Sequence, residues 1–411
     1  MNRNFWITIL TAVILITGTY FIFKNKPQEQ LKNNEVVFWT LQMNDFAPYI
    51  NGVIEEFETQ NPEIKIKWVD VPFSEGEKRT LASVLSDNPP DLVNLNPDFS
   101  ATLAHKGALY EIPEESTEQF YKEILNSLKY NGKIYSIPWY ATSAITIFNK
   151  DLISKSGIPV PKTYMEIAQY AHIVKMKTNA YILLPNLTEN DTMLKILNKF
   201  EASSSKLLTS ETAINVFDMF KYLYSNGLIP KETVTMTLQE SLEKYMSGNI
   251  VMLGAGANFL NMIKENAPST YAKTDIAPQL TGTIGQYDFS LMNFVIPLRA
   301  KHKDEALKFA LFLTNDKNQL ELAKLTNVLA VNKTTLQNEF YTKYDKDDLM
   351  AKARVISAKQ LNKVQPVYKT QKNQKEINNI INAATQEILL DKASTEEILN
   401  KAAQDWKKLE E

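Results

Sequence analysis

Residue types that often carry out catalysis are present in this sequence, but their spacing does not match a known catalytic or metal-binding arrangement. His105, His172 and His302 lie far apart, and none has a partner at metal-ligand spacing. The acidic run at residues 345–348 lacks the glycine and the terminal glutamate of a calcium loop. We therefore predict no metal site, and we interpret these residues as ordinary surface or partly buried positions.

Phosphate-binding and nucleophile motifs give the same result. Gly254 and Gly256 follow an expected strand, but residue 259 is phenylalanine where a dinucleotide loop has its third glycine. A phosphate-binding P-loop and a Gly-x-Ser-x-Gly motif are both absent. Carboxylate pairs are common but none is singled out by spacing, so glycoside hydrolysis stays possible in principle and unsupported. We predict no cofactor and no enzyme activity.

Composition excludes two further classes of function. The 411 residues contain no cysteine, so disulfides, thiolate catalysis and sulfur-ligated zinc are ruled out. Lys and Arg number 45 against 47 Asp and Glu, and no basic stripe with interleaved aromatic residues occurs. Nucleic acid is therefore not an expected partner.

The N-terminal segment predicts contact with a membrane. Phe5 to Phe23 carries no charge and is nearly as long as the roughly 20 residues that span a bilayer. We interpret residues 1–32 as an uncleaved signal anchor followed by a polar tether that contains Pro27. The alternative is a cleaved signal peptide, which would leave a periplasmic or secreted protein.

The remaining chain alternates strands and helices, which predicts parallel sheets covered by helices. Strands are expected near residues 35–40, 64–68, 91–95, 134–137, 143–148, 250–253 and 290–296. Helices are expected near residues 164–176, 190–200, 211–225, 240–246, 304–314, 316–325, 346–360, 374–390 and 394–409. A chain of this length is enough for two domains with cores of their own.

One stretch, residues 139–148, has the pattern of a strand that crosses between two domains. Pro138 is expected to end the preceding strand and fix the chain's direction. The first part of the stretch is polar and aromatic, and the second part is β-branched and apolar. We expect Trp139 or Tyr140 to border a cleft, and Ile145 and Ile147 to be buried in a sheet.

Four segments in order resemble the bacterial extracellular solute-binding proteins of the sugar-binding class, which include maltose-binding protein. The most specific is NGKIYSIPWYATSAITIFNKDLISKSGIPVPKTYMEI, in which Tyr164 stands where the family usually has tryptophan. The others are VVFWT with FETQNPEIKIKW, PPDLVNLNPDFSATLAHKGALYEI, and SGNIVMLGAGANFLNMIKE. The resemblance covers roughly residues 35 to 411.

The resemblance implies an α/β fold of two lobes joined by a multi-strand hinge, with the ligand cleft between them. Lobe 1 would hold residues 33–141 with 293–340, and lobe 2 residues 142–292 with 341–411. The implied protein is a monomer outside the cytoplasm that captures a carbohydrate and delivers it to the permease subunits of an ABC importer.

Sugar binding requires hydrogen-bonding side chains and an aromatic plate, and we expect them in the loops after the strands. The candidates are Trp39, Gln42, Asn44, Asp45, Asn96, Asp98, Trp139, Tyr140, Thr142, Asn258, Tyr287, Asp288 and Asn293. By resemblance, Asp98 matches a sugar-binding carboxylate. Thr142 replaces a carboxylate of maltose-binding protein, and Asn258 replaces a stacking tryptophan of many relatives, which puts a maltodextrin-like ligand in doubt.

Each candidate also has a purely structural interpretation. Trp39 could be strand core, Asp98 could cap the helix that begins near Phe99, and Tyr140 could pack against the hinge. Two other functions stay open on the same scaffold. One is a polysaccharide-acting enzyme, and the other is a sensory binding protein that serves a receptor.

Overall fold

The computed structural model describes residues 35–326, 328–361 and 373–410. The predicted anchor at residues 5–23 lies outside this part of the chain. In the described part, no helix combines the length and apolar character needed to cross a membrane.

The first sheet has six strands, with Ser290–Val295 as one of its inner strands. Its order is β12-β6-β11-β3-β1-β2. The strands are β1 (Glu35–Leu41), β2 (Lys65–Val71), β3 (Leu92–Leu95), β6 (Ile137–Thr142), β11 (Ser290–Val295) and β12 (Leu329–Ala330). β1 runs parallel to β2 and β3, while β11 is antiparallel to β3 and β6. The carboxyl ends of β1, β3 and β6 therefore meet the start of β11 at one edge.

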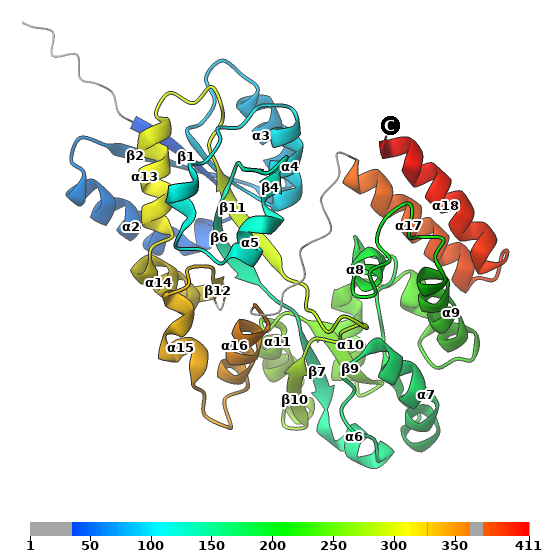
Figure 1. Cartoon of the computed structure of the whole chain (residues 1–411). Helices are drawn as coiled ribbons and strands as arrows, with labels where there is room; N and C mark the ends of the chain where they lie inside the picture. Colours follow the sequence, from blue (N-terminus) through cyan, green and yellow to red (C-terminus); the bar gives the residue numbers. More distant parts are fainter. Residues whose placement is uncertain (1–34, 327, 362–372, 411) are drawn as a thin grey trace, which may run out of the picture.

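Helices cover both faces of this sheet (Figure 1). A large apolar core lies on one face, against α2 (Ala47–Gln60), α5 (Lys122–Ser127), α13 (Lys303–Leu313) and α14 (Asp316–Thr326). A smaller core lies on the other face, against α3 (Phe73–Val84) and α4 (Pro97–His105). The short hairpin β4 (Lys129–Tyr130) and β5 (Lys133–Ile134) is separate.

The second sheet has four strands in the order β10-β7-β9-β8. They are β7 (Ile145–Asn149), β8 (Tyr181–Leu183), β9 (Ile250–Ala255) and β10 (Thr274–Pro278). β8 is parallel to β9, and β7 is antiparallel to both β9 and β10. The carboxyl ends of β8, β9 and β10 thus lie beside the start of β7, at a single edge.

Two apolar cores cover the faces of the second sheet. The larger involves α6 (Lys150–Ser156), α7 (Tyr164–Thr178), α8 (Thr192–Asn198), α9 (Glu211–Ser225), α17 (Gln374–Leu389) and α18 (Thr395–Glu410). The smaller involves α10 (Leu238–Met246), α11 (Phe259–Asn266), α12 (Pro268–Tyr271) and α16 (Leu349–Gln360). α15 (Glu339–Thr342) precedes α16.

Local sequence explains where α7 begins and where α6 ends. Thr163 accepts a hydrogen bond from the Glu166 amide, and the Glu166 carboxylate accepts one from the Thr163 amide. This reciprocal capping box satisfies two donors that a helix start leaves free. Gly157, at φ 69°, ends α6 in the left-handed conformation that glycine adopts easily.

Within the described residues, three segments cross between the two sheets. Ser143 and Ala144 join β6 to β7, residues 279–289 join β10 to β11, and the chain after β12 leads into α16. Figure 1 shows β6 and β7 running from one group of elements toward the other. The lobe boundaries 33–141 with 293–340 and 142–292 with 341–411 remain a proposal; β11, which pairs with strands of the first sheet, begins at Ser290.

The crossing segment differs from the sequence expectation in two ways. Pro138 does not end a strand but lies inside β6, opposite a register shift between Met292 and Asn293 of β11. Such an irregularity tolerates proline because the regular ladder is already interrupted there. The stretch 139–148 is also not one continuous strand, because Ser143 and Ala144 separate β6 from β7. Ile145 and Ile147 are fully buried in the second sheet, as predicted.

Candidate functional site

A cavity of about 340 Å³ opens at the edge of the second sheet where the strand ends meet. Ala144 and Thr146 of the β7 start, Gly254 of β9 and the chain after β8 line it. The wall also includes α8, residues from 279–290, and Tyr164 and Leu238 at the starts of α7 and α10. Open α/β sheets bind ligands at this kind of edge, because backbone and side-chain polar groups converge where the strands end.

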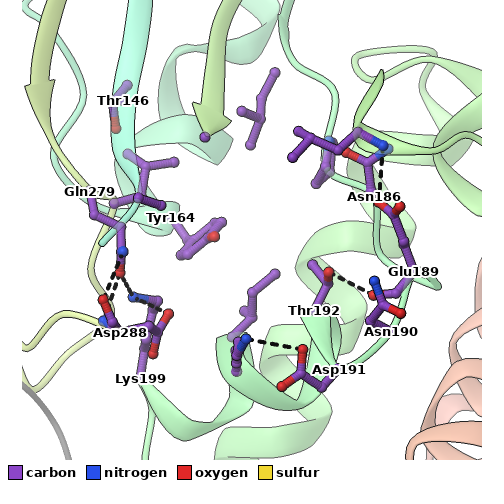
Figure 2. A pocket seen from close by; sticks show the side chains of 18 of the residues that line it. Thr146, Tyr164, Asn186, Glu189, Asn190, Asp191, Thr192, Lys199, Gln279 and Asp288 are labelled. Carbon is purple, nitrogen blue, oxygen red and sulfur yellow. Dashed lines mark hydrogen bonds and ion pairs between the residues drawn. The ribbon is translucent and has the colours of Figure 1, made fainter. Parts of the chain in front are cut away.

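Polar side chains from several elements surround the cavity (Figure 2). They are Thr146, Asn186, Glu189, Asn190, Asp191, Thr192, Lys195, Lys199, Gln279, Asp288 and Ser290. Tyr164 and Phe289 provide aromatic surface. Burial, reinforced by the negative charge of Asp288, raises the pKa of Tyr164, so its hydroxyl stays protonated.

Lys195 extends from α8 at the wall of the cavity and pairs with Asp191 at 3.1 Å. Burial lowers the pKa of Lys195, but the carboxylates of Asp191, Asp288 and Asp98 together raise it above its ordinary value. Asp98 belongs to α4 of the first sheet's layer.

Lys199, one turn farther along, is almost completely buried. Its side chain is 2% exposed, and Nζ lies 2.8 Å from Asp288 Oδ2. Nζ also donates to Gln279 Oε1 at 2.5 Å. Burial lowers the pKa of Lys199, and nearby Lys195 adds to this, while Asp288 opposes it.

Glu189 is the third carboxylate of the cavity wall. Its Oε2 accepts a hydrogen bond from the Leu238 amide at 3.0 Å, at the start of α10. Thr192 donates to the Glu189 carbonyl at 2.8 Å, which fixes the turn before α8. Carboxylates therefore outnumber lysines in the wall, and both lysines already have a carboxylate partner.

Of the predicted site residues, Asp288 lines this cavity. Tyr287 is its half-buried neighbour, and Asn258 is exposed in the turn after β9. Neither contributes to the wall. The sequence therefore located one member of the cavity on the crossing segment.

The candidates from the first sheet lie at that sheet's own strand-end edge. Trp39 is half-buried, with the Arg79 guanidinium 5.2 Å from its ring centroid. Gln42, Asn44 and Asp45 are exposed after β1, and Thr142 is exposed at the end of β6. They do not line the cavity.

Around α4 the roles of two neighbouring candidates differ from expectation. The cap of α4 is Asn96, whose Oδ1 accepts a hydrogen bond from the Phe99 amide at 2.8 Å. Asp98 lies in the first turn, so the alternative that it caps this helix is wrong. A carboxylate in a first turn is favoured by the partial positive charge of the helix start.

Two predicted ligand contacts are core residues. Trp139 has no exposed surface, and its ring stacks on Phe294 with centroids 4.6 Å apart. Asn293 is also fully buried, and its Nδ2 donates to Ser100 Oγ at 2.7 Å. Both predictions are wrong for the same reason: β6 and β11 are inner strands, covered on both faces.

Tyr140 has an intermediate position. It is half-buried against the first sheet's core, and its ring meets Trp139 edge-on with centroids 4.9 Å apart. Burial raises the pKa of its hydroxyl to about 12. It does not line the cavity.

The sequence predicts the helix near residues 190–200, which is α8, but sequence reasoning did not assign this helix or the loop before it to the site. The available signal was the run Asn186 to Thr192, which is rich in amide, carboxylate and hydroxyl side chains directly after an apolar segment. That segment, β8, is only three residues long and was not predicted as a strand. Among the described residues, no group of three or more His, Cys, Asp or Glu side chains is placed to hold a metal ion.

Comparison with known proteins agrees with this architecture. A periplasmic-binding protein from Synechococcus sp. MITs9220 superimposes with a TM-score of 0.80 at 28% identity, covering 91% of this chain and 98% of that one. A cyclic alpha-maltosyl-1,6-maltose binding protein from Arthrobacter globiformis superimposes with a TM-score of 0.76 at 16% identity, covering 91% and 98%, which supports the fold alone.

Curated relatives give the same assignment. The multiple sugar-binding protein of Streptococcus mutans is 24% identical over 74% of this chain and 76% of its own length. The diacetylchitobiose-binding protein DasA of Streptomyces coelicolor is 24% identical, covering 73% of each. The family model for bacterial extracellular solute-binding proteins matches residues 52–351, which is more than half of the chain. This protein belongs to the bacterial extracellular solute-binding protein family.

Proposed function

We propose that this protein captures a sugar or oligosaccharide outside the cytoplasm and, as a monomer, delivers it to the permease subunits of an ABC importer. The observation that carries the proposal is the polar cavity of about 340 Å³ at the strand-end edge of the second sheet. Hydroxyl, amide and carboxylate groups beside the Tyr164 ring are what a sugar needs, because its hydroxyls must be paired when buried. The names of the relatives support the same class of ligand.

Binding without turnover is the second part of the proposal. The cavity wall places Glu189, Asp191 and Asp288 together, but Asp191 pairs with Lys195 and Asp288 with Lys199. Glycoside cleavage requires two carboxyl groups free to act on the bond between two sugars, and both of these carboxylates are already bonded to lysines. Members of the family are binding proteins, which supports the same conclusion.

Closure of the two lobes completes the proposed site. Ser290 of β11, a strand of the first sheet, already lines the cavity, and the negative charge of Asp98 on α4 contributes to the raised pKa of Lys195. A hinge motion would bring Asn44, Asp45 and Asp98 over a ligand held by the second sheet. Ligand would stabilise this closed form, because only that form contacts it from both sides.

The charge of the wall predicts the electrical character of the ligand. Glu189, Asp191 and Asp288 oppose two lysines that are already paired, so an anionic group would meet net negative charge. We expect neutral sugars to stabilise the protein more than their uronic acids. Thermal unfolding with matched pairs, such as glucose and glucuronate or galactose and galacturonate, measures the difference.

The size of the expected stabilisation follows from mass action. A neutral ligand at about 100 times its dissociation constant adds roughly 2.7 kcal/mol. A panel of neutral mono- and oligosaccharides in which none raises the melting temperature would contradict the proposed function. A stronger effect of the uronic acids would contradict only the charge argument.

The N-terminal segment leads to a separate proposal about location. Phe5 to Phe23 is uncharged and about as long as a bilayer span, so we propose that it anchors the protein to the outer face of the membrane. Protein recovered from membranes should then keep its first residues. N-terminal sequencing that begins beyond residue 20 would instead identify a cleaved signal peptide.

A further inference from the structure

The first two crossing segments and the end of α16, the helix into which the third segment leads, meet in one buried group of polar side chains, which we call the hinge cluster. Its members are Ser143, Lys199, Gln279, Asp288 and Gln360, and all but Asp288 are at most 9% exposed. Ser143 belongs to the first crossing segment, Gln279 and Asp288 to the second, and Gln360 ends α16. Polar groups buried in this way require partners, so the cluster specifies one arrangement of the segments.

Hydrogen bonds join the first two crossing segments to each other and to Gln360 at the end of α16. Gln360 Nε2 donates to Ser143 Oγ at 2.8 Å and to the Ala144 carbonyl at 2.9 Å. Gln360 Oε1 accepts from the Gln279 amide at 2.7 Å. Ser143 Oγ donates to the Asp288 carbonyl at 3.2 Å. These two segments and the end of α16 are thus hydrogen-bonded into a closed ring.

The Gln279 side chain holds the second crossing segment in its bent form. Its Oε1 accepts from the Asp288 amide at 2.8 Å, and its Nε2 donates to the Asp288 carbonyl at 3.2 Å. The same Oε1 accepts from Lys199 Nζ. Gln279 and Asp288 therefore form one binding site for the ammonium group of Lys199.

Lys199 connects Gln279 and Asp288 to α8. It follows the last residue of that helix, and its Nζ lies 2.8 Å from Asp288 Oδ2. Gly282 of the same crossing segment packs on the Lys199 backbone so closely that an added Cβ would lie 2.3 Å from the Lys199 carbonyl oxygen. Both the side chain and the backbone of Lys199 are therefore fixed to the hinge.

The same helix forms a wall of the cavity. Lys195 and Ile196 line the cavity. Thr192, Lys199 and Asp288 line it as well (Figure 2). A ligand that moves or orders α8 would therefore act on the crossing segments through the Lys199–Asp288 ion pair. We propose that Lys199 is a positioning residue, which couples occupation of the cavity to closure of the lobes.

This inference rests on the proposed sugar-binding function for its ligand, but the ion pair also makes a prediction for the free protein. Removing one partner of a buried ion pair leaves an unpaired charge, which destabilises the fold. Removing both avoids that penalty but also removes the connection between α8 and the hinge. A double-mutant cycle separates these two effects.

The experiment uses Lys199→Met, Asp288→Asn and the double variant in the full chain. Lys221→Met is the control. Lys221 lies on α9, does not line the cavity, and forms an ion pair with Asp391 at 2.6 Å. Because the chain has no cysteine, Lys106→Cys and Lys206→Cys can carry a dye pair that reports the distance between lobes. Both positions are exposed.

We expect each single variant to have a lower melting temperature than the double variant. In the double variant the ligand-free distance distribution should be broader than in the wild type and in Lys221→Met. The neutral sugar that raises the melting temperature most should bind the double variant about tenfold more weakly, and the change in distance on binding should be reduced.

The opposite result is clearly recognisable. If the double variant has the wild-type distance distribution without sugar, or closes fully on binding it, Lys199 does not couple the cavity to the hinge. If no sugar binds the wild type, the proposed function fails, while the ligand-free distributions still decide the role of Lys199.

Discussion

Replacement of Trp139 with alanine is expected to lower the free energy of unfolding by about 3–5 kcal/mol. The indole is fully buried in the first sheet's core, stacked on Phe294 and in edge contact with Tyr140. Alanine would leave a cavity lined by these rings, because neighbouring inner strands cannot collapse into it. Chemical denaturation of the variant and the wild type measures the difference.

Sugar affinity provides the second half of this test. Trp139 does not line the cavity, so the fraction of Trp139→Ala that remains folded should bind sugar as the wild type does. Trp139→Phe keeps most of the buried apolar volume and should lose less stability. A large loss of affinity with little loss of stability would place Trp139 in the ligand site instead of the core.

Replacement of Gly254 with phenylalanine is expected to abolish sugar binding while the protein stays folded. Gly254 lines the cavity, and a Cβ added there would meet no atom within 4 Å. The new ring would therefore occupy space meant for the ligand, without backbone strain. We expect affinity to fall by about a hundredfold or more, which corresponds to roughly 2.7 kcal/mol.

A matched substitution controls for the general effect of an added phenylalanine. Gly52 is exposed on α2, away from the cavity, and an added Cβ there also meets nothing within 4 Å. Gly52→Phe should bind sugar like the wild type. Unchanged affinity in Gly254→Phe, with a melting temperature near that of the wild type, would show that the ligand lies elsewhere.

Periodicity and turn residues predicted most elements of the fold. The helix expected at residues 211–225 is α9 (Glu211–Ser225). The helix expected at residues 394–409 is α18, and its apolar residues Ile398, Leu399 and Trp406 are buried. These elements have strong repeating patterns and clear ends, such as Gly227 at φ 64°. Three-residue β8 has neither feature, because a short apolar run is too brief to show a period.

Burial within the crossing segments could not be read from local pattern. Trp139 lies in the polar and aromatic part of its stretch, and this pattern predicts contact with a ligand. However, β6 pairs with β11 on one side and with β12 on the other, so β6 is an inner strand. That pairing joins residues more than a hundred positions apart. Local polarity therefore gave the wrong exposure for Trp139 and Asn293.

The burial of Lys199 could not be predicted from local pattern either. A lysine at the end of an amphipathic helix is usually exposed, and nothing near it in the sequence indicates burial. Its partners, Gln279 and Asp288, are distant in sequence and meet it only through the fold. Asp288 could be predicted because it precedes an expected strand, whereas Lys199 could be found only from the structure.

The central claim is that one cavity binds a sugar and releases it unchanged. Isothermal titration calorimetry tests it most directly, with the neutral sugar that gives the largest thermal stabilisation. The sugar is then recovered from the calorimeter and analysed by chromatography. We predict one binding site per chain, loss of the binding heat in Gly254→Phe, and complete recovery of the intact sugar. Absence of binding heat in the wild type, or recovery of cleaved sugar, would contradict the claim.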